Sequence, residues 1–170
     1  MIRVLNTLYD LFLSADRIVI DTGPLLIHAI GAFRSDKLGD ICLCGAPGEE
    51  FNFLDRLFTS NQQFCITPYV LSELLYRVRS EFKLKEDGIE EFFRSYGTFL
   101  SNMGEIRIDK EKIIHDTGIK FGLADVSLLK ACEGTGTMIL SSDEPFCRFC
   151  ESRNIEFIEY KTFFLDNFLR

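Results

Sequence analysis

Four carboxylate residues occupy positions from which a folded chain could bring them together. Asp21 ends the apolar run RIVID (17–21), and Asp143 follows the apolar run TMILSS (137–142). Glu73 and Asp125 lie in the early turns of two segments, 68–82 and 123–133, that have helical patterns. In a parallel sheet, the carboxyl ends of the strands and the starts of the helices that follow them share one edge. We therefore expect all four side chains to reach that edge.

Carboxylates that lie close together repel one another, so such a cluster needs a compensating positive charge. Mg²⁺ and Mn²⁺ are suited to this role because they prefer oxygen ligands and also bind phosphate oxygens. An ion held by carboxylates can activate water and stabilise in-line attack on a phosphodiester. The sequence thus predicts a Mg²⁺ or Mn²⁺ site whose ligands are also its catalytic residues: Asp21, Glu73, Asp125 and Asp143.

Each of these carboxylates also has an ordinary structural interpretation. Asp21 precedes Thr-Gly-Pro and is typical of a turn or a helix cap. Asp143 is placed to cap the next helix, and Asp125 to interact favourably with a helix dipole. Glu73 lies opposite an apolar stripe of Leu71, Leu74, Leu75, Val78 and Phe82, which favours a solvated side chain. The combination of four is more specific than any one of them.

Basic residues follow Glu73 along the same predicted helix. Arg79 and Lys83 have the i,i+4 spacing of one helix face, and Arg77 lies four residues after Glu73. We interpret the three as candidate contacts for substrate phosphates. The competing interpretation is a solvated basic face.

Four other residues near the candidate site have less specific signals. Thr22 either contributes its hydroxyl to the site or acts as a turn residue. Gly23 is expected to let the backbone turn tightly beside Asp21. We interpret His28 and His115 as core or surface histidines rather than as a metal ligand or base.

The elements that must position these residues alternate between strands and helices. The five expected strands are 17–21, 63–67, 105–109, 137–142 and 155–160. The expected helices are 24–33, 51–60, 68–82, 88–102, 110–121, 123–133, 144–154 and 161–170, after an N-terminal helix with Val4, Leu5, Leu8, Leu11 and Phe12 on its apolar positions. This alternation predicts a three-layer α/β/α fold with a central five-stranded parallel sheet.

Length and composition favour one folded domain. The 170 residues carry 46% hydrophobic and 26% charged side chains. We divide the domain into an N-terminal helical extension (1–16), the α/β body, and an insertion-like helical and loop segment (33–62). The sequence has neither a membrane-length apolar run nor a secretory signal pattern, so we expect a cytoplasmic protein with reduced cysteines and no membrane partner.

The net charge of −7 argues against a general nucleic-acid coat protein, because phosphate binding normally requires a surplus of Lys and Arg. It leaves open an enzyme whose acidic site meets phosphate through a metal ion. A phosphatase with a strand-end aspartate nucleophile is a weaker alternative, since dehalogenase-like sites need a second aspartate where Gly23 stands.

Four stretches together resemble the PIN domain family: VIDTGPLL, ITPYVLSELL, KFGLADVSLLKAC and MILSSDEPF. They occur in the order typical of that family and span Ile18 to about Phe164. The resemblance implies a PIN-like fold and a metal-dependent ribonuclease acting on single-stranded RNA. It assigns the acidic positions to the four carboxylates above and matches the family's Ser/Thr-x-Asp element to Ser141, Ser142 and Asp143.

Many PIN proteins are toxins with an antitoxin partner, and many form homodimers, so the resemblance adds both to the expected partners. The chain departs from the family in its N-terminal helix, its longer segment before Gln62, and DEPF at the fourth motif. The main alternative to a nuclease is a non-catalytic PIN-fold module that binds RNA or assembles with proteins.

Overall fold

Five parallel strands form one sheet at the centre of the protein. A computed structural model describes residues 8–168, and the strand order is β3-β2-β1-β4-β5. The strands are β1 (Arg17–Ile20), β2 (Phe64–Ile66), β3 (Gly104–Glu105), β4 (Thr137–Ser141) and β5 (Phe157–Glu159). In register, Ile18 pairs with Phe64 on one side of β1 and with Met138 on the other. The predicted five-stranded parallel sheet is confirmed.

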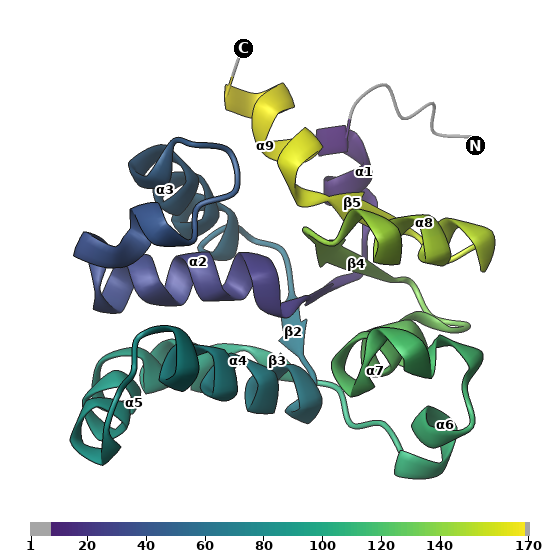
Figure 1. Ribbon diagram of the computed structural model, residues 1–170. Helices are drawn as coiled ribbons and strands as arrows, with labels where there is room; N and C mark the ends of the chain where they lie inside the picture. The colour runs from purple at the N-terminus through teal and green to yellow at the C-terminus, as the bar shows by residue number, and fades with distance from the viewer. Residues whose placement is uncertain (1–7, 169–170) are drawn as a thin grey trace.

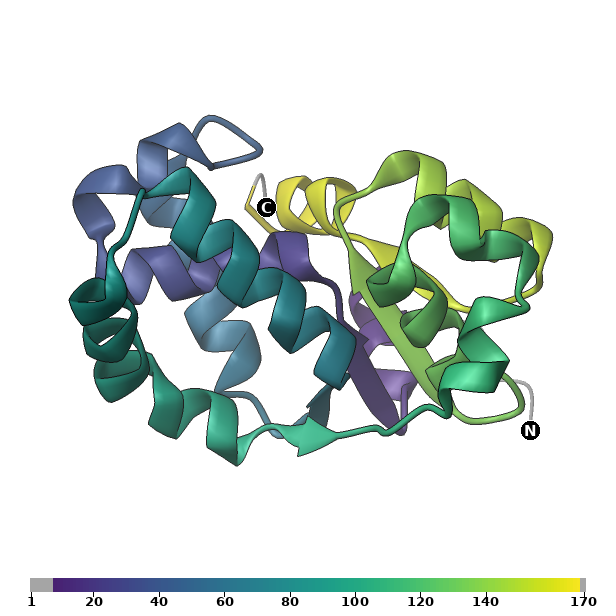
Figure 2. The same cartoon turned by 60° about the horizontal axis from the view of Figure 1, so that its bottom comes forward.

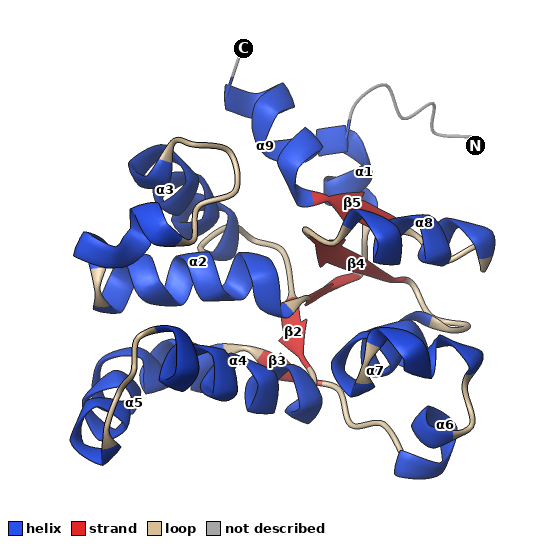
Figure 3. Cartoon of the chain, in the orientation of Figure 1, coloured by secondary structure: helices blue, strands red, loops and turns tan. Residues whose placement is uncertain are grey.

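Helices cover both faces of this short sheet, as Figure 3 shows. The α-helices are α1 (Leu8–Ser14), α2 (Thr22–Phe33), α3 (Pro47–Phe58), α4 (Pro68–Glu81), α5 (Glu86–Asn102), α6 (Lys110–Ile114), α7 (Leu123–Cys132), α8 (Glu144–Ser152) and α9 (Tyr160–Phe168). Two 3₁₀ helices, η1 (Ser35–Asp40) and η2 (Thr117–Phe121), complete the described chain. Helices α2 to α5 lie on one side of the sheet and α6 to α8 on the other (Figures 1 and 2). The fold is the predicted three-layer α/β/α arrangement.

The two central strands are buried along nearly their whole length. Ile18, Val19 and Ile20 of β1 are fully buried, as are Met138, Ile139 and Leu140 of β4. A parallel strand that is covered on both faces requires such a continuous apolar run. The apolar pattern in the sequence therefore located these strands closely.

Capping residues fix where the helices at the carboxyl edge begin. The Thr67 hydroxyl accepts the Val70 N–H at 3.3 Å, and Pro68 supplies the first turn of α4. Asp21 precedes α2 and Asp143 precedes α8, and each accepts a backbone N–H of its own helix. The edge that carries the carboxylates is thus built from three helix starts and the β1 and β4 strand ends.

The segment 110–121, predicted as one helix, is broken at Asp116. Helix α6 ends at Ile114, and η2 begins at Thr117. The Asp116 carboxylate accepts the Gly118 N–H at 2.7 Å, which replaces a helical hydrogen bond with a capping one. The predicted strand 105–109 was also too long, because β3 pairs only through Gly104 and Glu105.

The apolar stripe of α4 differs from the predicted one. Its buried residues are Val70, Leu74 and Val78, spaced by four, while Leu75 is only half-buried. The stripe faces neighbouring α2, and Glu73 borders it rather than lying opposite.

The described part of the N-terminal extension contains α1, and the 33–62 segment contains η1 and α3 joined by a loop. Helix α1 packs on α9, with the Phe12 and Phe163 rings 5.5 Å apart, whereas Val4 and Leu5 lie outside the described residues. In the 33–62 segment, the fully buried Glu50 carboxylate accepts the N–H groups of Leu43 and Cys44. This carboxylate holds the loop between η1 and α3. Within residues 8–168, no helix is both long and apolar enough to cross a membrane.

Candidate functional site

Asp21 is held rigidly at the carboxyl end of β1. Its Oδ1 accepts the Thr22 N–H at 2.6 Å, and its Oδ2 accepts the Ser141 hydroxyl at 2.6 Å. The side chain is 7% exposed, so few of its contacts are with solvent. The Ser141 bond crosses from β4 to β1 and fixes the carboxylate orientation.

The loop after β4 brings Asp143 to the same edge. Its backbone N–H donates to Ser141 Oγ at 3.0 Å, and its Oδ1 accepts the Phe146 N–H at 2.8 Å. Ser141 therefore contacts both aspartates, as a donor to Asp21 and an acceptor from Asp143. The Asp143 side chain is exposed, so its capping role leaves a carboxylate oxygen facing solvent.

Close approach of α2 to this loop depends on Gly23. A Cβ atom at that position would lie 2.1 Å from Ser142 Oγ. The glycine is thus required by the contact between the α2 start and the 141–143 loop. The sequence singled out Gly23 correctly but predicted a backbone turn as the reason.

Helices α4 and α7 bring in Glu73 and Asp125, both half-buried. The two helix starts are joined by a buried bond of 2.6 Å between Thr67 Oγ1 and Ser127 Oγ. Ser127 also donates to the Ala124 carbonyl at 2.6 Å, so Thr67 is the donor in their shared bond. Sequence reasoning missed Ser127, whose only signal is a small polar residue among the apolar residues of α7.

The electrostatics of Asp125 show that the four carboxylates lie close to one another. Burial, followed by the charges of Asp21, Glu73 and Asp143, raises its pKa to about 8. A shift from three like charges requires that all three lie nearby. Asp21, Glu73 and Asp143 therefore lie near enough to Asp125 for their charges to act on it, and the predicted four-carboxylate site stays a prediction.

Asp21 carries a smaller shift for the same reasons. Burial is the largest cause of a net rise in its pKa to about 6, and the charges of Glu73 and Asp143 contribute to that rise. The hydrogen bonds from Ser141 and from the Thr22 N–H stabilise the ionised form and limit the shift. The pKa values of Asp21 and Asp125 are thus both raised, mainly by burial and further by neighbouring negative charge.

The donor set matches a hard divalent cation in chemistry but is not a closed ligand cage. In the described part of the chain, no group of three or more His, Cys, Asp or Glu side chains is arranged to hold a metal ion. Carboxylate oxygens are nevertheless the ligands that Mg²⁺ and Mn²⁺ prefer. The buried Thr22 Oγ1, on the residue after Asp21, has no hydrogen-bond partner among residues 8–168 and is a further candidate oxygen ligand.

The predicted phosphate contacts are less well placed. Arg77 pairs with Glu81 at 2.6 Å, so its guanidinium is already engaged. Arg79 is exposed on α4, while Lys83 lies beyond the end of that helix with φ 50°. The expected common helix face of Arg79 and Lys83 is therefore wrong, because α4 ends at Glu81.

Neither histidine belongs to the carboxylate cluster. His28 is buried among aromatic rings, its Nδ1 is 2.7 Å from the Tyr96 hydroxyl, and its Nε2 is 3.3 Å from Asp55. Burial lowers its pKa, against an opposing effect of Asp55. His115 is exposed at the end of α6. The interpretation of His28 as a satisfied core residue is confirmed.

The chain was compared with protein-family models and with curated protein sequences, and neither comparison produced a match.

Proposed function

We propose that this protein is a metal-dependent endoribonuclease that hydrolyses phosphodiester bonds of single-stranded RNA, with Mg²⁺ or Mn²⁺ as its cofactor. The observation that carries the proposal is that Ser141 ties Asp21 and Asp143 to one edge, where their charges and that of Glu73 act on Asp125. The RNA preference comes from the resemblance of the four sequence stretches to PIN domains.

The four carboxylates would hold the ion together with the Thr22 hydroxyl. A bound divalent ion at such a site supplies activation of water and neutralisation of phosphate charge. It also reconciles a chain of net charge −7 with a polyanionic substrate, because the ion lies between the two negative partners.

The residues of the chain itself would do three things. Ser141 orients Asp21 through the 2.6 Å bond and so presents one fixed carboxylate. Asp125 holds a proton at neutral pH in the metal-free protein and gives it up when a cation binds, because ligands must be deprotonated. Asp143, whose side chain is exposed, lies where substrate arrives.

The test is cleavage of a labelled single-stranded RNA by the purified chain with Mg²⁺ or Mn²⁺, with and without excess chelator. Double-stranded RNA and single-stranded DNA are the specificity controls. Asp21→Asn and Asp143→Asn report on the site, and Glu90→Gln, an exposed residue on α5, is the matched control for losing one carboxylate. We expect cleavage by wild type and by Glu90→Gln only.

Cleavage that persists with chelator contradicts the metal mechanism. Cleavage that is equal in Asp21→Asn indicates a contaminating nuclease. A pure protein that cleaves none of the substrates with either metal favours the non-catalytic RNA-binding or assembly module instead.

A further inference from the structure

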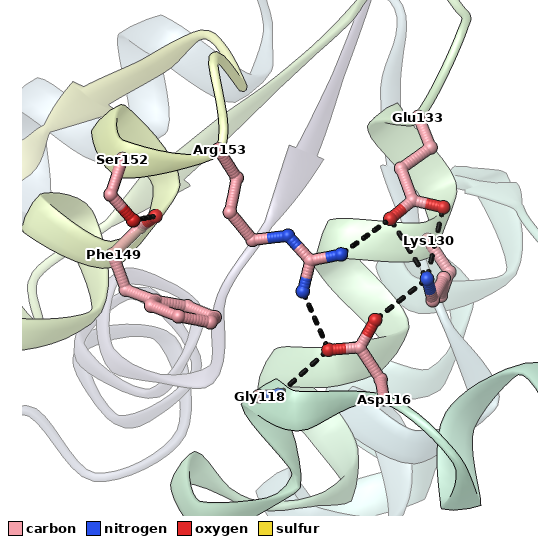
Figure 4. Close-up of polar contacts among 7 residues, drawn as sticks. All are labelled: Asp116, Gly118, Lys130, Glu133, Phe149, Ser152 and Arg153. Atoms are coloured by element: carbon pink, nitrogen blue, oxygen red, sulfur yellow. Dashed lines mark hydrogen bonds and ion pairs between the residues drawn. The ribbon is translucent and has the colours of Figure 1, made fainter.

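Four charged side chains form a ring at the carboxyl ends of α7 and α8, which Figure 4 shows in close-up. Asp116 contacts Arg153 Nη1 and Lys130 Nζ, each at 2.7 Å. Glu133 contacts the same two cations, with Lys130 Nζ at 2.8 Å and Arg153 Nη2 at 3.2 Å. Two carboxylates and two cations thus close a ring with no net charge.

The ring joins the helix ends that lie opposite the candidate site. Lys130 is in the last turn of α7, and Arg153 caps the carboxyl end of α8. Asp125 lies in the first turn of α7, and Asp143 caps the start of α8. At ~1.5 Å rise per residue, Asp125 lies about 8 Å from Lys130 and about 12 Å from Glu133 along α7, and Asp143 lies about 15 Å from Arg153 along α8. The same two helices therefore carry the ring at one end and the site at the other.

Helix η2 fills the space between α7 and α8 beside the ring. A Cβ atom on Gly118 would lie 2.9 Å from the Phe149 ring of α8 and 3.1 Å from Leu129 of α7. The Phe121 ring centroid lies 4.9 Å from that of Phe149 and 5.9 Å from that of Phe146, both on α8. The chain then passes through Gly122, with φ 124°, directly into α7. Only a residue without a side chain fits between the two helices here.

Asp116 is the centre of this arrangement. Its side chain is 4% exposed and accepts three bonds, from Arg153, from Lys130 and from the Gly118 N–H. Burial alone raises the pKa of its carboxyl, but these bonds outweigh burial and hold the pKa well below its ordinary value. Buried, fully bonded ion networks contribute less to net stability than to fixing one geometry.

We propose that the ring of Asp116, Lys130, Glu133 and Arg153 is a positioning device that sets the separation of Asp125 from Asp143 and so the affinity of the site for its cation. The part of this inference that concerns cation affinity rests on the proposed function, whereas the part that concerns the placement of the two helix starts does not. The residues of the ring are positioning residues, since none of them reaches the carboxylate cluster.

The test uses Arg153→Gln, which releases α8 from the ring and leaves the Asp116–Lys130 pair in place. Arg148→Gln is the matched control, because Arg148 lies on the same helix, is exposed and forms an i,i+4 pair with Glu144. Gly118→Ala disturbs the packing between α7 and α8 without changing a charge. Two quantities are measured: Mn²⁺ affinity, and amide hydrogen exchange in the first turns of α7 and α8.

We expect Arg153→Gln and Gly118→Ala to weaken Mn²⁺ binding by about 2- to 30-fold, the range typical of residues that act on a site from a distance. Exchange should speed up in the first turns of α7 and α8 but not in β1 or β4. Arg148→Gln should change neither quantity.

If amide exchange in the first turns of α7 and α8 is unchanged in Arg153→Gln and Gly118→Ala, the inference is wrong, whatever the Mn²⁺ affinity of these variants. Faster exchange throughout β1 and β4 also overturns it, since the ring would then serve stability alone. Wild-type protein that binds no Mn²⁺ is a failure of the proposed function, and the exchange pattern still decides whether the ring positions the two helix starts.

Discussion

Ser141 and Asp21, 120 residues apart in sequence, are joined by a 2.6 Å hydrogen bond from the Ser141 hydroxyl to Asp21 Oδ2. The bond links the carboxyl ends of β4 and β1, the two most deeply buried strands. Because the acceptor is a carboxylate, the bond is strongest when Asp21 is ionised. One side chain thus sets both the orientation and the charge state of the central aspartate.

Ser141→Ala should raise the pKa of Asp21 above its value of about 6, because the bond that favours the ionised form is lost. At a pH where Asp21 is ionised, the free energy of unfolding should fall by about 1–3 kcal/mol. Carbon-13 NMR titration of the carboxyl group and denaturant unfolding measure the two effects. Ser152→Ala, which removes an exposed hydroxyl on α8, should change neither. An unshifted Asp21 titration would contradict the role of this bond.

Asp21→Asn should keep or raise the melting temperature of the metal-free protein, because it removes a buried charge that Glu73 and Asp143 oppose. Cleavage should fall at least about 100-fold, given that a ligand worth several kcal/mol in the transition state is lost. Wild type should gain about 2.7 kcal/mol of stability at a cation concentration a hundredfold above Kd, and the variant much less. A variant that melts well below wild type yet keeps the full cation-induced shift would identify Asp21 as a structural turn residue.

The metal-free protein should lose stability through Asp125 as the pH rises from about 4 to about 8. The folded-state pKa of Asp125 is about 8 and its ordinary value is 3.8, so the folded protein binds the proton more tightly than the unfolded chain. Stability from this group is therefore full below about pH 4 and is lost as the pH rises to about 8. Unfolding free energies of wild type and Asp125→Asn, compared across this range, isolate the effect from other titrating groups. A constant difference between the two proteins would contradict the raised pKa.

Thr67→Val should destabilise the protein by about 1–2 kcal/mol, since α4 loses its cap and Ser127 loses its donor. Cleavage should fall further than stability explains, because the same bond ties the helices that carry Glu73 and Asp125. Activity measured well below the melting temperature separates the two effects. The control is Thr59→Val, which removes an exposed hydroxyl bonded only within its own segment. If Thr67→Val and Thr59→Val have equal activity, then Thr67 acts only as a helix cap.

The sequence determined the local features that place the carboxylates. The apolar runs ending at Asp21 and before Asp143 located β1 and β4, because a strand buried on both faces must be continuously apolar. Thr67 and Pro68 located the start of α4 through capping chemistry that involves only adjacent residues. Since parallel strands share one carboxyl edge, these local signals led to the prediction that four acidic residues share that edge.

Only the tertiary structure decided what surrounds those residues. The bonds of Thr67 to Ser127 and of Ser141 to Asp21 join residues 60 and 120 positions apart, and the ring around Asp116 joins three separate elements. No sequence period encodes such contacts, because they depend on how helices pack once the sheet has formed. The raised pKa of Asp125 has the same origin: burial and three neighbouring charges, none adjacent in sequence, act on it only in the folded chain.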